Sequence, residues 1–252
     1  EVDVWRSLVV AVRRVFVRDV EVGIVAVQCF AQDADGELYP LDWWGGSIHK
    51  LVPEVASGMP ERLSETGCVD PSQPLRPAAG AIPYRVNAPF FSDDAYKERF
   101  LFLPEGGTIF AATNGNLVLP PGAVLMKTFA FDGRMTETRF LQRHDDGQWS
   151  AYTYRWLADG SDALLIDEPE TTSVAGLDWA FPGRGQCHQC HSTPSGVSIA
   201  LTVQQLDGDG YYPATGAWAN QLDTLEAIGA FTYDIPPEAR ALTPLPDPFD
   251  PA

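Results

Sequence analysis

The sequence has no apolar run long enough to cross a membrane and no segment with the pattern of a signal peptide. The apolar stretch that begins at Leu8 is soon interrupted by Arg13 and Arg14. Basic residues are also few, because 17 Lys and Arg stand against 34 Asp and Glu, for a formal net charge of -17. A surface this acidic repels nucleic acid phosphates and anionic lipid headgroups. We therefore expect neither nucleic acid binding nor membrane insertion.

Cysteine is scarce as well, with only 4 in 252 residues. Cys187 and Cys190 are separated by two residues and are followed by His191. Cys29 and Cys68 stand alone in the sequence. These last two could form a disulfide in an oxidising compartment or remain free thiols, because the sequence does not give the distance between them.

Alternation of apolar and polar residues dominates the middle of the chain. It runs through residues 116–119, 124–131, 136–141 and 149–156, and Asp-Gly pairs stand at 132–133, 146–147 and 159–160. This pattern is typical of an antiparallel meander with one buried face. Residues 94–100 fit a short helix capped by Ser92, and longer helical periodicity is confined to 222–230. We predict a mainly β fold, an antiparallel meander or sandwich with few short helices.

The segment Cys187-His188-Gln189-Cys190-His191 has the spacing of a haem c attachment site. Two thiols add across the two vinyl groups of haem to form thioethers, and the gap of two residues lets both sulfurs reach one edge of the porphyrin. The adjacent His191 would then lie beneath the iron as its proximal ligand. His188, between the cysteines, is expected to point outward.

Zinc binding and thiol redox chemistry are the alternatives for this segment. A structural zinc site needs four ligands in separate knuckles, whereas both cysteines and both histidines are crowded here into five residues. A thioredoxin-like pair needs a βαβ context, and this segment follows a β meander. The sequence therefore favours a haem c-binding loop.

Three residues that precede the motif are candidates for the haem pocket. Trp179 and Phe181 could wall the porphyrin with apolar surface, and Arg184 could face a haem propionate. The alternatives are ordinary core packing for the two aromatic side chains and a solvated loop position for Arg184.

The sixth position of the iron has three candidate ligands, Met126, Met135 and His144. Each of them also has a simpler interpretation. Met126 lies in an alternating strand and would belong to the core, Met135 lies beside an Asp-Gly turn and would be exposed, and His144 would be a surface histidine. The sequence leaves this choice open.

Residues 33–52 resemble the last blade of a β-propeller. The likeness lies in Asp35-Gly36-Glu37-Leu38-Tyr39, in Trp44-Gly45-Gly46 and in Ile48-His49-Lys50-Leu51-Val52-Pro53. The family is the soluble glucose/sorbosone dehydrogenases that use pyrroloquinoline quinone. The resemblance carries over no residue that binds this quinone, so we expect no pyrroloquinoline quinone site within this chain.

Four later segments, in order, resemble a family of bacterial c-type cytochrome domains. They are residues 62–67, 82–89, 121–129 and 179–187. Members occur alone as dihaem cytochromes or fused behind the propeller of these dehydrogenases. The resemblance implies a propeller-blade remnant over 1–53, a haem c-binding cytochrome domain over 54–243 and a Pro-rich linker over 244–252. Since the family pattern includes a second Cys-x-x-Cys-His downstream, we expect this chain to be a piece of a longer protein.

The resemblance implies periplasmic or extracellular electron transfer. One covalent haem c would take electrons from an upstream quinone-dependent sugar dehydrogenase domain and pass them to a downstream cytochrome or second haem domain. An alternative is a haem c enzyme or small-ligand binder, because the order of the strands and the motif is similar to cytochrome P460 and β-type cytochrome c′, with Lys127 as the residue of interest. A third alternative is a structural domain in which haem serves as a folding staple.

Overall fold

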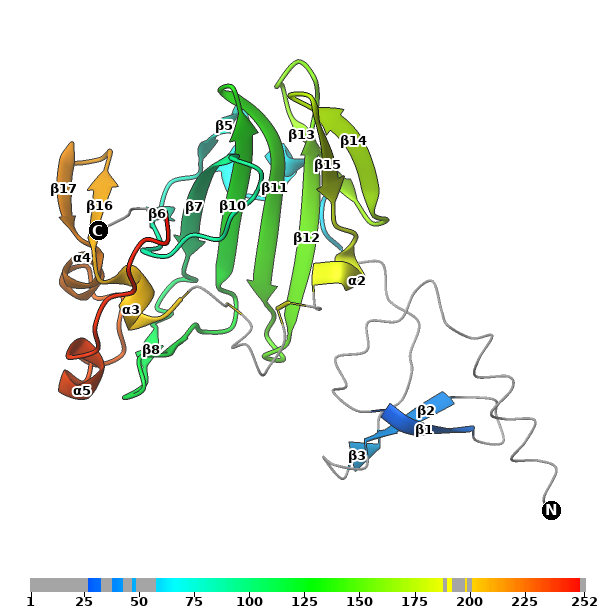
Figure 1. Ribbon diagram of the computed structural model, residues 1–252. Coiled ribbons are helices and arrows are strands. Elements are labelled where there is room, and N and C mark those ends of the chain that lie inside the picture. Colours follow the sequence, from blue (N-terminus) through cyan, green and yellow to red (C-terminus); the bar gives the residue numbers. More distant parts are fainter. Residues whose placement is uncertain are drawn as a thin grey trace. The chain divides into compact units, whose positions relative to one another are not determined.

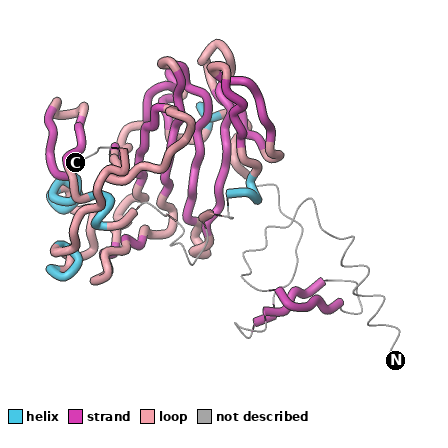
Figure 2. The backbone as a smooth tube through the Cα atoms, viewed as in Figure 1, coloured by secondary structure: helices cyan, strands magenta, loops and turns pink. Residues whose placement is uncertain are grey.

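The computed structural model describes residues 27–32, 38–42, 47–48, 58–187, 190–191, 198 and 201–249. The chain divides into two compact units, residues 1–59 and 60–252. Strands predominate and the few helices are short (Figure 1 and Figure 2). The predicted mainly β class with antiparallel sheets is therefore confirmed. Within the described part of the chain, no helix is long and apolar enough to span a membrane.

The first unit contains a three-stranded antiparallel sheet in the order β1-β2-β3. Its strands are β1 (Val27–Gln32), β2 (Leu38–Asp42) and β3 (Ser47–Ile48). Gln32 pairs with Leu38 where the first hairpin closes. The Asp-Gly turn at 35–36 and residues 49–53 lie outside the described residues, so the resemblance to a propeller blade remains a prediction.

The two isolated cysteines are free thiols. Cys29 on β1 is exposed, and Cys68 of the second unit is half-buried. Burial raises the pKa of Cys68 to about 11, so that thiol stays protonated at neutral pH.

A six-stranded antiparallel sheet organises the second unit, in the order β13-β12-β11-β10-β7-β6 (Figure 1). Its strands are β6 (Ile82–Pro83), β7 (Tyr96–Phe102), β10 (Val124–Phe131), β11 (Arg134–Arg143), β12 (Trp149–Trp156) and β13 (Ala163–Ile166). The predicted meander corresponds to β10, β11 and β12, whose residues pair along almost their whole lengths. Asp132 and Gly133 both adopt positive φ, which the tight β10–β11 hairpin requires.

Shorter elements surround this sheet. The strand pairs are β4 (Val69–Asp70) with β5 (Gln73–Pro77), β8 (Phe110–Ala111) with β9 (Leu117–Val118), β14 (Glu170–Val174) with β15 (Leu177–Phe181), and β16 (Asp209–Tyr212) with β17 (Ala217–Asn220). The helices are η1 (Leu63–Glu65), α2 (Arg184–Cys187), α3 (Val203–Leu206), α4 (Gln221–Ala227) and α5 (Pro237–Arg240). The helical periodicity at 222–230 thus corresponds to α4.

We name the two faces of the large sheet after neighbouring residues of β10. On the Met126 face, Phe100, Met126, Phe140 and Tyr152 stand opposite one another on four strands. On the Leu125 face, the corresponding residues are Leu101, Leu125, Leu141 and Ala151. Because side chains alternate along a strand, these two sets lie on opposite sides of the sheet.

Both faces of the sheet are buried, so the expectation of one buried face is wrong. The Met126 face is covered by residues that come before the sheet, since Leu63 is fully buried there and the Tyr154 hydroxyl donates to Pro60 O at 2.8 Å. The Leu125 face is covered by residues that come after it, including Leu201, Val203 and Leu222. Local alternation does not show which distant segments cover a sheet.

The expected helix at 94–100 is also wrong, because residues 96–100 belong to β7 and Asp94 lies in a turn before it. Asp93 and Asp94 have positive φ, a conformation that does not start a right-handed helix, and Ser92 O accepts the Ala95 N–H in a turn instead. The strand then pairs with β10, where Arg99 stands opposite Lys127. Long-range pairing therefore overrides a weak local helix signal.

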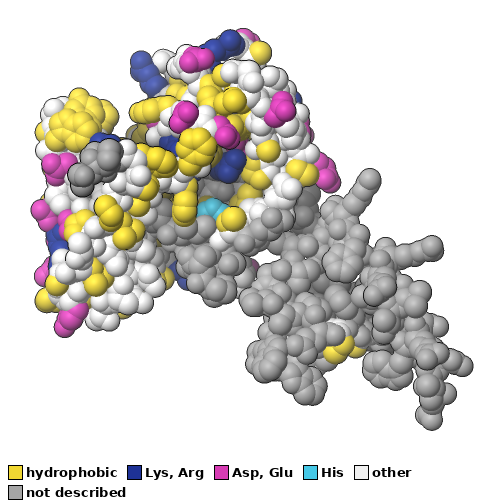
Figure 3. Space-filling view, in the orientation of Figure 1, with side chains coloured by type: hydrophobic (Ala, Val, Ile, Leu, Met, Phe, Trp, Pro, Cys, Tyr) yellow, Lys and Arg dark blue, Asp and Glu magenta, His cyan; other side chains and the backbone are white. Residues whose placement is uncertain are grey.

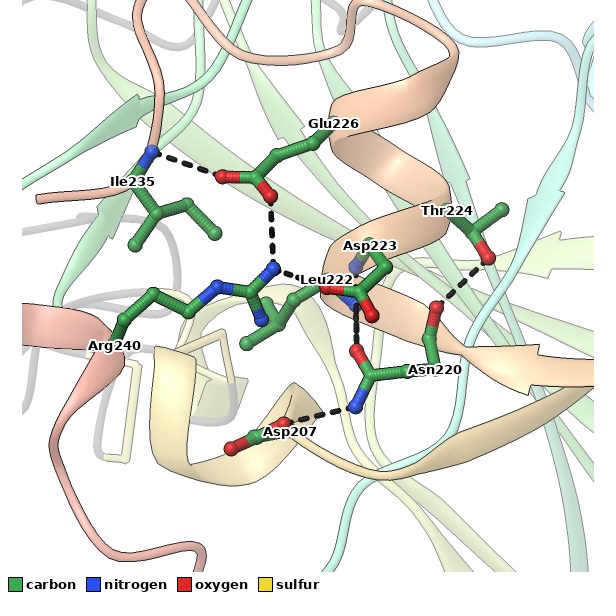
Figure 4. A network of polar contacts seen from close by, with 8 residues as sticks. All are labelled: Asp207, Asn220, Leu222, Asp223, Thr224, Glu226, Ile235 and Arg240. Carbon is green, nitrogen blue, oxygen red and sulfur yellow. Dashed lines mark hydrogen bonds and ion pairs between the residues drawn. The ribbon is translucent and has the colours of Figure 1, made fainter. Parts of the chain in front are cut away.

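The C-terminal helices are held by a polar network (Figure 4). Asn220 caps α4, since its Oδ1 accepts from Leu222 N at 2.9 Å, and its Nδ2 donates to Asp207 Oδ1 at 2.9 Å. Arg240 of α5 forms ion pairs with both Asp223 and Glu226 of α4, and its Nη2 lies 2.8 Å from Glu226 Oε2. The network places the helices that cover the Leu125 face.

Replacing Asn220 by Ala is expected to destabilise the second unit by about 1 kcal/mol, because the first turn of α4 loses its cap. Urea unfolding followed by circular dichroism measures this. Asn220→Ser is the matched control, since serine keeps a capping oxygen and should stay within about 0.5 kcal/mol of the wild type. Equal stability of the Ala variant and the wild type would contradict the capping role.

Candidate functional site

Cys187, Cys190 and His191 lie on one helical turn. Cys187 ends α2, and its carbonyl oxygen accepts hydrogen bonds from Cys190 N at 3.3 Å and from His191 N at 2.9 Å. Residues three and four positions apart on such a turn face the same side. These bonds bring the backbone of both cysteines and of His191 close together, as attachment of a porphyrin at one edge requires. His188 lies outside the described residues, so its outward orientation remains a prediction.

One hydrogen bond ties α2 to the residue that follows β13, and another closes the start of the helix itself. Arg184 N donates to Asp167 O at 3.2 Å, and the Gln186 side-chain oxygen accepts from Gly183 N at 3.1 Å. A Cβ at Gly183 would lie 2.7 Å from Pro169 Cδ and 2.9 Å from Asp167 O. Only glycine therefore allows this close approach, which positions the motif beside β12.

Cys187 is half-buried and packs against the apolar cluster of the Leu125 face. Burial raises the pKa of its thiol, and the opposing effects of Arg139 and of the nearby Thr153 hydroxyl are smaller. Thr153 and Arg139 stand opposite each other on β12 and β11. The sulfur of Cys187 is thus placed at the β12 side of the Leu125 face, whereas Cys190 is exposed.

The two aromatic candidates belong to the protein core. Trp179 packs edge-on against Phe129 and Phe131, with ring centroids 5.3 and 5.0 Å apart, and its Nε1 donates to Glu137 Oε2 at 2.9 Å. Phe181 is 1% exposed and lies in the same cluster. This packing is what the core alternative describes, and a contact of either ring with a porphyrin remains a prediction.

Arg184 extends to the other face of the sheet. Its guanidinium lies 4.9 Å from the Tyr152 ring centroid, and its Nη2 is 3.4 Å from Ser150 Oγ. Tyr152 belongs to the Met126 face, while Cys187 packs on the Leu125 face. The structure therefore does not bring Arg184 and Cys187 to the same side of the sheet.

The three candidates for the sixth ligand lie on the Met126 face too. Met126 and Met135 line a small cavity there with Leu63 and Trp156. His144 Nε2 is 3.3 Å from the hydroxyl of Tyr152. The sheet thus lies between these side chains and the face against which Cys187 packs.

A row of basic side chains crosses the Leu125 face and was missed by the sequence reasoning. Arg99, Lys127 and Arg139 stand directly opposite one another on β7, β10 and β11, and Thr153 continues the row on β12. We call these three basic residues the cation row. Directly paired residues have Cβ atoms about 5 Å apart, where like charges destabilise a sheet. In Figure 3, basic side chains and a histidine lie in a recess bordered by apolar side chains.

In the described part of the chain, the cation row is ion-paired with Glu137. Glu137 is fully buried and accepts from Arg139 Nε at 2.5 Å and Nη2 at 2.9 Å. Lys127 Nζ and Arg139 Cζ lie 4.4 and 4.7 Å from the centroid of the Phe129 ring. Among the described residues, no ion pair or hydrogen bond joins the side chain of Arg99 or Lys127 to an acidic group. Glu137 therefore balances Arg139, whereas Arg99 and Lys127 have no carboxylate partner in the described part of the chain.

The row changes the acidity of its own members. Burial is the main cause that lowers the pKa of Lys127 to about 7, and Arg99, Arg139 and Lys97 lower it further against the opposing effect of Glu137. Burial also lowers the pKa of Arg99. Alternation along 124–131 indicated that Lys127 shares a face with Leu125, but the register that aligns the three strands is a tertiary property.

Neither the local geometry nor the comparison with known proteins identifies what this site binds. In the described part of the chain, no three His, Cys, Asp or Glu side chains are grouped so that they could hold a metal ion. No known protein family, curated protein or solved structure matches the chain. The resemblance to cytochrome domains therefore stays a hypothesis that rests on the residues themselves.

Proposed function

We propose that the second unit carries a covalent haem c on Cys187 and Cys190, with His191 as an iron ligand, and that it transfers electrons. The observation that carries this is the pair of backbone hydrogen bonds by which Cys190 and His191 both close onto Cys187 O. When bound, haem supplies a one-electron redox couple at its iron. The attachment would join a cofactor to the edge of an already packed sheet.

The residues of the chain would hold and shield this group. Cys187 is buried enough to fix one edge against the core, and exposed Cys190 leaves the turn open toward solvent. Short α2, tied down at Gly183 and Arg184, would fix the orientation of His191. A rigid, partly exposed site of this kind suits transfer of electrons to a partner without substrate binding.

The proposal extends to the setting of the protein. Covalent haem c implies a periplasmic or extracellular location, an electron donor in an upstream quinone-dependent sugar dehydrogenase domain, and an acceptor in a downstream cytochrome or second haem domain. Support for this comes from the resemblances in the sequence. The net charge of -17 would favour an acceptor with a basic docking surface.

A second candidate is a haem c protein that binds or converts a small nitrogen compound. It is favoured by one observation, the position of Lys127 on the face against which Cys187 packs. Its pKa of about 7 would let Lys127 donate or accept a proton near neutral pH. High-spin iron that binds nitric oxide would favour this candidate, and low-spin iron would favour the electron carrier.

Variants of the motif test the proposed attachment. After expression with a cytochrome c maturation system, the double variant Cys187→Ala/Cys190→Ala should carry no covalent haem in a denaturing gel stained for haem. His191→Ala should lose the spectrum of the native haem, because the iron loses its protein ligand. Cys29→Ala and His144→Ala are matched controls that should retain haem. Equal haem in the double variant and the wild type would refute the attachment site.

A further inference from the structure

Among the described residues, the cation row has more basic side chains than nearby carboxylates neutralise. Three basic side chains are aligned on adjacent strands, and only Glu137 among the nearby described residues is ion-paired to one of them. Like charges in direct register weaken a sheet, and burial adds a desolvation penalty. In a chain with a net charge of -17, this arrangement calls for an anionic partner.

The row also lies between two apolar clusters. On one side, the next residues along the strands are Leu101 and Leu125, which belong to the large core cluster. On the other side is Phe129, which packs with Trp179 and Phe181. A flat apolar ligand with anionic groups would match a surface of this kind, because its rings would contact the clusters and its charges the row.

The distance from the cysteine motif to the cation row matches the width of a porphyrin. Cys187 lies beside Thr153 on β12, and strands are spaced by about 4.8 Å. Lys127 is two strands from Thr153 and Arg99 is three, which gives about 10 and about 14 Å across the sheet. The thioether edge and the propionate edge of a haem lie on opposite sides of its ring, at a separation of this order.

We propose that the cation row of Arg99, Lys127 and Arg139 is an oxyanion-binding site, and that the carboxylates it takes are the propionates of the haem. The identity of the ligand rests on the function proposed above. Arg99 and Lys127, the two basic side chains of the row that are not paired with a described carboxylate, match two propionates. The sequence suggested Arg184 as the residue that faces a propionate, but Arg184 lies on the Met126 face. The cation row takes its place in this proposal.

Resonance Raman spectra of the haem-loaded full chain test the contact directly. The propionate bending bands should shift in Lys127→Gln and in Arg99→Gln. The control Arg76→Gln removes an exposed positive charge on β5 and should leave these bands unchanged. Each of the two row variants should also shift the equilibrium with a one-electron mediator about tenfold toward oxidised haem, because the propionates lose a neutralising charge. Unchanged bands in both row variants would overturn the assignment to propionates.

Inorganic phosphate distinguishes a free anion from the propionates. At constant ionic strength, phosphate should not change the melting temperature of the haem-loaded wild type if propionates occupy the row. A phosphate-dependent rise that Lys127→Gln abolishes would keep the oxyanion site but assign it to a free anion. No response to phosphate together with unchanged Raman bands would overturn the site itself. If the wild type takes up no haem, the proposed function fails, and phosphate binding to that haem-free chain still tests the row.

Discussion

Replacing Glu137 by Ala is expected to destabilise the second unit by about 2–3 kcal/mol, because a buried acceptor is lost while the Arg139 side chain, 34% exposed, stays partly solvated. The carboxylate is fully buried and accepts hydrogen bonds from Arg139 and from Trp179 Nε1. Without it, Arg139 loses its carboxylate partner, and the buried indole N–H loses its acceptor. Losing a fully buried carboxylate that accepts three hydrogen bonds costs more than losing one member of a surface pair.

Urea unfolding of the haem-free chain, followed by tryptophan fluorescence, measures this loss. The matched control is Glu170→Ala, which removes a carboxylate from the partly exposed pair with Arg155 and should cost less than about 1 kcal/mol. The two variants delete the same groups from different environments. If Glu137→Ala is no less stable than Glu170→Ala, the carboxylate does not hold the row together.

Replacing Lys127 by Met is expected to stabilise the haem-free chain at pH 7, by about 2–4 kcal/mol. The native pKa of Lys127 is lowered to about 7 from 10.5, by burial first and then by Arg99, Arg139 and Lys97, with Glu137 opposing. Between these two values the unfolded chain binds a proton that the native chain lacks, so native stability rises with pH. The loss of native stability caused by the buried Lys127 ammonium is complete below pH 7 and disappears as the pH approaches 10.5.

The advantage of the Met variant should therefore shrink when unfolding is measured at pH 10 in place of pH 7. Lys97→Met is the control, because Lys97 already donates to Phe90 O at 2.6 Å and should gain little from removal. The double variant Cys187→Ala/Cys190→Ala supplies the haem-free background. If the difference in unfolding free energy between the Met variant and its parent does not depend on pH, or if the Met variant is less stable, then the charged Lys127 does not destabilise the native chain. With haem bound, the proposed propionate contact should reduce or reverse the gain.

Local features of the fold were predictable from the sequence. The β10–β11 hairpin follows from alternation on both sides of Asp132-Gly133, because the turn needs positive φ at two neighbouring residues and this pair tolerates it. The cysteine motif is likewise local, since five consecutive residues determine its geometry. Features of this kind depend only on residues that are close together in the sequence.

Features that depend on pairing between distant segments were not predictable. β7 looked helical because the partner that makes it a strand, β10, lies more than twenty residues later. The sequence does not show on which face of the sheet the three sixth-ligand candidates lie, and all three lie on the Met126 face. The cation row was missed for the same reason, because Arg99, Lys127 and Arg139 meet only through the register of three strands.

The most direct test is the intact mass of the wild-type chain after expression with a cytochrome c maturation system, together with its pyridine haemochrome spectrum. We predict one haem per chain, bound through two thioethers, that survives denaturation and is absent from the double cysteine variant. A wild-type chain with the mass of the polypeptide alone and no haemochrome would contradict the account, and would return Cys187–His191 to a zinc or thiol function.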